Sequence, residues 1–172
     1  AGYRYSGPTA AYSFKCVQKQ RFDLVVVLSP YHAYHPAAIL SSAHNYYQTP
    51  LGNINVERKI IDSFSERIKS EPSLIFNQIA YDEEHSLEIE LPFLQCVLDG
   101  DFSLFPLMIR SVDPYQSLII ADLVYEEIKN RNLLIVASTD LSHFYPQSVA
   151  DRLDQEILNQ IQTFSIENIY RT

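Results

Sequence analysis

Short continuous apolar runs mark three strands in this chain. They cover residues 24–28 (LVVVL), 104–109 (LFPLMI) and 133–138 (LLIVAS). Runs of this length are typical of strands that are buried on both faces of a sheet. Pro106 interrupts the second run, and because proline has no N–H to donate to a neighbouring strand, this strand is expected at a sheet edge or with irregular geometry.

Longer stretches with apolar residues three or four positions apart predict helices. They cover residues 8–17, 57–70, 114–129 and 148–162, and the third begins with Pro114, which suits a first helical turn. Strands that alternate with helices predict an α/β fold with three layers (α/β/α), in which helices cover both faces of a largely parallel central sheet. The chain of 172 residues is expected to form a single domain.

A further helical pattern follows an acidic turn. Its apolar stripe consists of Leu87, Leu91, Leu94 and Leu98. Pro92 lies within the stripe, so a helix kinked at this residue is predicted. Asp82, Glu83 and Glu84 precede the stripe, and we interpret them as a favourable helix N-terminus, because carboxylates complement the positive end of the helix dipole.

Composition narrows the function classes. The formal net charge of −8 and the scattered basic residues argue against nucleic-acid binding. No apolar run is long enough to span a bilayer, so no membrane partner is expected. Cys16 and Cys96 both lie in apolar helical patterns and are predicted to be buried free thiols, which fits a reducing, cytoplasmic setting.

Candidate chemistry follows two of the predicted strands. Ligands of parallel sheets bind beyond the carboxyl ends of the strands. The first strand continues into SPYHAYH, which carries His32, and the third continues into STDLSHF, which carries Asp140 and His143. We therefore expect the imidazoles of His32 and His143 to reach one polar pocket.

A third segment strengthens this expectation. The turn at residues 82–86 (DEEHS) adds acidic groups and an imidazole. We therefore give a shared metal site or acid–base site the same weight as ordinary hydrogen bonding within the loops. His35 is assigned to the loop before Pro36, and His44 to a surface or packing role among aromatic neighbours.

Several self-contained motifs are missing from the sequence. No glycine-rich phosphate loop and no GxSxG, CxxC, HExxH or EF-hand pattern occurs. Mononuclear iron sites instead take two histidines and a further ligand from separate loops, and separate loops are what this chain offers.

Five stretches together resemble a known family. In chain order they are AGYRYSG, SPYH, TPLGNINV, EHSLEIELPFLQ and STDLSHF. Their sequences and spacing are similar to those of the Memo family, whose bacterial and archaeal members are also called AmmeMemoRadiSam system protein B. The resemblance covers essentially the whole chain.

This resemblance implies a fold similar to class III extradiol dioxygenases and a pocket that holds non-haem iron, with copper and zinc as alternatives. It implies His32 and His143 as metal ligands, with His143 also a candidate acid–base group and Asp140 a residue that orients an imidazole or shapes the pocket. A radical-SAM protein is an implied partner.

The sequence also departs from the family pattern. The resemblance implies a histidine just before the AGY turn and a later Cys-Gly segment, but the sequence begins at Ala1 and ends at residue 172 without them. Neither Cys16 nor Cys96 corresponds to the expected cysteine. Ser29 and Tyr31 replace the usual glycine and serine. We therefore expect that the domain lacks an N-terminal strand region and a C-terminal portion.

Three functions are consistent with these patterns. The first is a metal-dependent, iron-using oxidoreductase related to the dioxygenases. The second is a non-catalytic protein that binds a small molecule, a peptide or the radical-SAM partner through the same pocket, with tyrosines such as Tyr31 and Tyr34 forming a contact surface. The third is a zinc hydrolase that uses Asp140 and His143.

Overall fold

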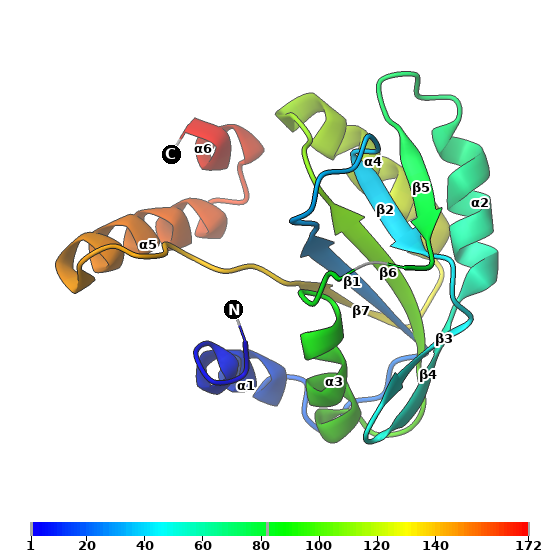
Figure 1. The fold of residues 1–172 in the computed structure, drawn as a ribbon, viewed down its shortest axis with the longest axis horizontal. Coiled ribbons are helices and arrows are strands. Elements are labelled where there is room, and N and C mark those ends of the chain that lie inside the picture. The colour runs from blue at the N-terminus through cyan, green and yellow to red at the C-terminus, as the bar shows by residue number, and fades with distance from the viewer. Residues whose placement is uncertain (1, 82, 172) are drawn as a thin grey trace.

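A single mixed sheet organises the protein (Figure 1). The computed structural model describes residues 2–81 and 83–171. The strands of the sheet are β1 (Leu24–Pro30), β2 (Ile39–Ser42), β3 (Tyr46–Thr49), β4 (Gly52–Val56), β5 (Phe76–Ile79), β6 (Ser103–Ile109) and β7 (Leu133–Ala137). The helical elements are α1 (Gly7–Lys15), α2 (Arg58–Ile68), the 3₁₀ helix η1 (Glu88–Glu90), α3 (Leu91–Val97), α4 (Pro114–Ile128), α5 (Gln147–Gln162) and α6 (Ile166–Arg171).

The three strands predicted from apolar runs lie side by side, with β1 between β6 and β7 and with β7 at the end of the strand order. The strand order is β3-β4-β6-β1-β7, and β2 joins β6 to β5. β1 is parallel to both β6 and β7, whereas β2 is antiparallel to β6 and β3 is antiparallel to β4. The largely parallel sheet is therefore confirmed, and the carboxyl ends of β1 and β7 lie at the same end of it.

Helices cover both faces of this sheet, which confirms the three-layer α/β/α fold. Val26 of β1 faces a core formed with α2 and α4, where the rings of Phe64 and Phe105 lie 5.8 Å apart. Val25 faces the opposite core with α1 and α3, where Phe14 and Phe93 stack at 5.0 Å. Alternate residues of one strand thus serve two cores, which explains its unbroken apolar sequence.

Pro106 lies inside the sheet, so the expected edge position for β6 is wrong. On one side β6 pairs with β1 along its length. On its other side β4 pairs with β6 as far as Leu104, and β2 pairs with it only from Met108 onward. Pro106 lies between these two pairings, and its carbonyl accepts a hydrogen bond from Ser41 Oγ at 2.6 Å. The missing N–H therefore costs no ladder hydrogen bond, which reconciles proline with an interior strand.

The predicted kink at Pro92 is also wrong, because α3 begins there. Pro92 occupies one of the first two helical positions of α3, after the short 3₁₀ helix η1. The first backbone N–H groups of a helix have no partner within it, so proline is tolerated at this position. The leucine stripe is real: Leu87, Leu91 and Leu94 are all buried.

The structure tests the predicted burial of the two cysteines. Cys16 and Cys96 are free thiols, as expected, but both are exposed, so their predicted burial is wrong. Apolar neighbours in sequence place a cysteine on a helix but do not decide which way it faces.

Among the helices that the structure describes, none combines the length and apolar character needed to cross a membrane.

Helix α5 forms where it was predicted, yet it does not cover the sheet. Figure 1 shows α5 projecting away from the strands on the side of β7. None of its residues is buried, although apolar residues recur along it at positions 149, 153, 157 and 161. Ile135 of β7 is likewise half exposed. The β7 side of the sheet is thus only partly covered.

Candidate functional site

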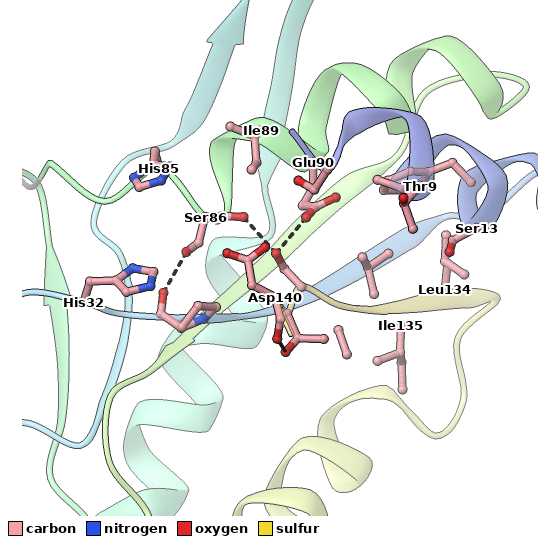
Figure 2. A pocket seen from close by; sticks show the side chains of 18 of the residues that line it. Thr9, Ser13, His32, His85, Ser86, Ile89, Glu90, Leu134, Ile135 and Asp140 are labelled. Atoms are coloured by element: carbon pink, nitrogen blue, oxygen red, sulfur yellow. Dashed lines mark hydrogen bonds between the residues drawn. The ribbon is translucent and has the colours of Figure 1, made fainter. Parts of the chain in front are cut away.

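A cavity of about 570 Å³ lies beside the carboxyl ends of β1 and β7. Its walls come from α1, from residues 85–90 and from residues 134–143, as Figure 2 shows in part. Pro30, at the end of β1, also lines it. This is the position at which parallel sheets bind ligands.

The residues predicted from the two strand exits all reach this cavity. His32, Asp140 and His143 line it. The side chain of His32 is 62% exposed and that of His143 is 49% exposed, so both imidazoles are accessible to solvent. The structure thus brings the two loops together, whereas the chemical roles of these residues stay predictions.

A buried carboxylate holds His32. Nδ1 of His32 lies 2.9 Å from Oε2 of Glu84 and 3.1 Å from Oε1. The backbone N–H of His32 donates to Oε2 at 2.7 Å, so the ring and the backbone share one acceptor group. The Glu84 side chain is only 3% exposed. Glu84 therefore holds both the backbone and the Nδ1 edge of His32, while the rest of the ring faces solvent and the cavity.

Glu84 is ionised across the physiological range. Burial by itself raises the pKa of Glu84, but hydrogen bonds from His32 and Ser86 outweigh it and lower the pKa to about 2. An ionised carboxylate only accepts hydrogen bonds, so Nδ1 of His32 must carry a proton. When His32 is neutral, its Nε2 then has a free lone pair that can accept a proton or bind a metal.

This arrangement corrects our interpretation of the acidic turn. Glu84 does not serve as the N-terminal charge of a helix, since it is buried and η1 begins only at Glu88. Asp82 lies outside the described residues. Sequence reasoning missed the role of Glu84 because its partner is 52 residues away and helix-dipole complementation explained the acidic run equally well.

His85 adds a third imidazole to the cavity wall. Its ring stacks on that of His32, with ring centres 6.0 Å apart and planes 14° apart. Its backbone N–H donates to Oε1 of Glu84 at 3.0 Å. The turn at 82–86 was correctly associated with a polar pocket, but no role had been assigned to His85.

Asp140 and His143 form a second pair. Oδ2 of Asp140 lies 3.4 Å from Nε2 of His143. The backbone N–H of Ser142 donates to Asp154 of α5 at 2.9 Å, which ties the loop to that helix. Asp140 thus lies close to the imidazole of His143, and its predicted role of orienting an imidazole or shaping the pocket stays a prediction.

Ser86 links the segments that form the cavity. Its N–H donates to Glu84 Oε1 at 2.9 Å, and its hydroxyl donates to the carbonyl of Pro30 at 2.7 Å. Its own carbonyl lies 3.1 Å from Ser138 Oγ, which also lies 2.7 Å from Glu90 Oε1. Ser86 therefore joins the exits of β1 and β7 to the turn that carries Glu84.

The remaining histidines lie elsewhere. His35 accepts a hydrogen bond from the backbone N–H of Ala37 at 3.0 Å, as befits a loop residue. His44 is exposed. Neither side chain lines the cavity.

The residues described do not complete a metal centre. Across residues 2–81 and 83–171, no group of three or more His, Cys, Asp or Glu side chains is arranged to hold a metal ion. Nδ1 of His32 is taken by Glu84, and Nε2 of His143 faces Asp140. An iron site of the usual kind needs at least three protein donors, so the donor set found here falls short of the implied metal.

Comparisons with known proteins identify relatives over the whole chain. The family model for Memo-like proteins matches residues 1–172. A "MEMO1 family protein" of Saccharolobus islandicus (strain M.14.25 / Kamchatka #1) is 29% identical over 174 residues, which cover 99% of this chain and 60% of the relative. Another of Nitrosopumilus maritimus (strain SCM1) is 29% identical over 170 residues, covering 99% and 61%.

A third relative gives the same picture. The "MEMO1 family protein" of Saccharolobus solfataricus is 28% identical over 174 residues, covering 99% of this chain and 60% of the relative. The chain thus spans about three fifths of the length of the curated relatives it matches. The match over residues 1–172 shows that this chain belongs to the Memo-like protein family.

Proposed function

We propose that the chain forms the small-molecule-binding pocket of a Memo-like protein, in which His32 meets the polar group of the ligand. The observation that carries this proposal is the contact between His32 Nδ1 and Glu84 Oε2 at 2.9 Å beside the cavity. A carboxylate that holds Nδ1 directs Nε2 away from itself. The cavity of about 570 Å³ is within the range of small-molecule sites.

The lining indicates which ligand the pocket suits. Figure 2 shows His32 and His85 on one side of the cavity, and Thr9, Ser13 and Leu134 on the other. One side therefore offers imidazoles to a polar or anionic group, while the other offers aliphatic and hydroxyl surface to an uncharged body. With Nε2 unprotonated, His32 is equipped to accept a proton from a bound hydroxyl or similar group.

Binding of an amphipathic dye tests this proposal. We would titrate the intact protein with 1-anilinonaphthalene-8-sulfonate, which joins an aromatic body to an anion, and follow its fluorescence. We expect His32→Ala to weaken binding at least about fivefold, which corresponds to about 1 kcal/mol. His44→Ala is the matched control, since His44 is exposed and outside the cavity. Equal affinity in the wild type and His32→Ala would contradict the proposal, provided that circular dichroism shows both to be folded.

A second candidate is a non-haem iron centre with two donors from His32 and His143. It is favoured by the convergence of these imidazoles on one cavity, and carboxylate-held histidines are common among metal ligands. Because the described residues fall short of a full ligand set, we assign no reaction step to iron.

Iron retention tests this second candidate. The intact protein would be loaded anaerobically with ferrous ion, desalted and analysed for metal. Retained iron that is lost in the His32→Ala, His143→Ala double variant and kept in His44→Ala would support the candidate. No retained iron in the wild type, or equal retention in the double variant, would contradict it.

A further inference from the structure

Ser138 faces more acceptors than one hydroxyl proton can serve. Its Oγ lies 2.7 Å from Oε1 of Glu90 and 3.1 Å from the carbonyl oxygen of Ser86. A serine hydroxyl has one proton to donate, and it can also accept. If Glu90 is ionised, its carboxylate and the carbonyl of Ser86 compete for the single proton of Ser138, and one of the two contacts is left without a hydrogen bond.

A proton on Glu90 resolves this competition. Glu90 then donates to Ser138 Oγ, and Ser138 donates to the carbonyl of Ser86. Both contacts become hydrogen bonds in one relay, which runs from Glu90 through Ser138 to the turn that carries Glu84. In Figure 2 one dashed line leads from Glu90 and another from Ser86, and the two contacts meet at Ser138 Oγ.

The surroundings of Glu90 favour the protonated form. Burial is the largest effect and raises the pKa of Glu90 above its ordinary value, whereas a hydrogen bond from Ser138 to the ionised form would lower it. The negative charge of Asp140 at the exit of β7 raises the pKa further, and the net direction is upward. Tyr3, in the turn before α1, is a further titratable neighbour of Glu90; burial is the main cause that raises the pKa of this tyrosine, and Glu90 contributes less. Glu88, on the same 3₁₀ helix, is exposed. No basic side chain among the described residues forms an ion pair with Glu90.

We propose that Glu90 carries a proton in the folded protein and donates it to Ser138 Oγ, so that Ser138 donates to the carbonyl of Ser86. Glu90 then adds no negative charge to the cavity wall, although Asp140 in the same lining is a carboxylate whose pKa is lowered. This rests on the proposed function and deepens it, because an uncharged carboxyl group beside α1 suits the uncharged body of a ligand better than a buried carboxylate would.

Carbon NMR measures this proton directly. The side-chain carboxyl ¹³C signals of the intact protein would be followed against pH, and the Glu90 signal assigned by its loss in Glu90→Gln. We expect its midpoint to lie at least about one pH unit above the ordinary glutamate value near 4.3. Glu88→Gln, which removes an exposed carboxylate of the same helix, should leave that signal in place. A Glu90 midpoint in or below the ordinary range would overturn the proposal.

Ser138→Ala decides the direction of the hydrogen bond. If Glu90 donates to Ser138, the variant removes a partner of the protonated form, so the Glu90 midpoint falls. If Ser138 instead donates to an ionised Glu90, the midpoint rises, and the proposal is overturned. Neither outcome depends on His32: unchanged dye binding in His32→Ala would leave the Glu90 result standing, and an ordinary Glu90 midpoint would leave the His32 proposal standing.

Discussion

His32 Nδ1 lies 2.9 Å from Glu84 Oε2, across 52 residues of sequence and at the exit of a central strand. Glu84 Oε1 meanwhile accepts from the backbone N–H groups of His85 and Ser86. One buried carboxylate thus organises its own turn and the loop that follows β1. The stability of this corner and the orientation of its imidazole depend on the same group.

Replacing Glu84 by glutamine should destabilise the protein. An amide has only one acceptor oxygen, so its NH₂ group would face N–H donors that the carboxylate now satisfies. Leaving buried donors unsatisfied costs about 1–3 kcal/mol, and we expect Glu84→Gln to lower the free energy of unfolding by this amount. Chemical denaturation measures it. Glu83→Gln, at an exposed neighbour, should change stability by no more than about 0.5 kcal/mol, and equal losses in the two variants would contradict the account.

Acid should remove the stabilisation that Glu84 provides. Its pKa is lowered from 4.5 to about 2 in the folded protein. A lowered pKa contributes stability that is fully present above the unfolded-state value and is lost as the pH falls toward the folded-state value. The contribution is on the order of 3 kcal/mol. The stability gap between the wild type and Glu84→Gln should therefore narrow between about pH 5 and about pH 2. A gap that stays constant over this range would show that Glu84 is not held ionised.

Ser41 should contribute to the stability of the protein, because its hydroxyl donates the hydrogen bond that β6 would otherwise receive from a paired strand at Pro106. Its buried hydroxyl donates to the carbonyl of Pro106, where neither β4 nor β2 pairs with β6. Ser41→Ala leaves this carbonyl without that donor, so we expect a loss of about 1–3 kcal/mol by thermal or chemical unfolding. Ser73→Ala, at an exposed serine, serves as the control. Equal stability of the two variants would mean that Pro106 needs no such partner.

Shortening an isoleucine to alanine should reduce the free energy of unfolding more on α4 than on α5. Ile120 of α4 is 4% exposed and packs in the core, whereas no residue of α5 is buried. Ile120→Ala should cost about 2–5 kcal/mol, and Ile157→Ala on α5 less than about 1 kcal/mol. Denaturation of both variants makes the comparison. Similar costs would contradict the observed arrangement, in which α5 does not pack on the sheet.

The central strands could be predicted because their burial on both faces leaves a continuous apolar record. β1 and β6 carry it. β7 has a similar apolar sequence, but it lies at the end of the strand order and none of its residues is fully buried. The peripheral strands do not: β3 reads YYQT and β5 reads FNQI, and each has only four residues. Such short, half-polar segments become strands only because β4 and β2 offer edges for β3 and β5 to pair with, which no local pattern reveals.

The residues of the candidate site also fall into two groups, those that local sequence locates and those whose role depends on distant partners. The rule that ligands bind at strand exits located His32, Asp140 and His143 from local sequence alone. Glu84 and Glu90 were missed, because the role of each depends on a partner about fifty residues away in the chain, and several acidic residues crowd the same turn. The balance of burial and hydrogen bonding lowers the pKa of Glu84 and raises that of Glu90. Neither burial nor hydrogen bonding can be deduced from the residue type alone.

The tautomer of His32 tests the central claim most directly, because the account requires Glu84 to hold Nδ1 and leave Nε2 free. Nitrogen-15 NMR of the imidazole, recorded at a pH where His32 is neutral and assigned with His32→Ala, distinguishes a protonated nitrogen from a bare one. The account predicts a protonated Nδ1 and a bare Nε2 in the wild type. A protonated Nε2 with a bare Nδ1 would contradict it.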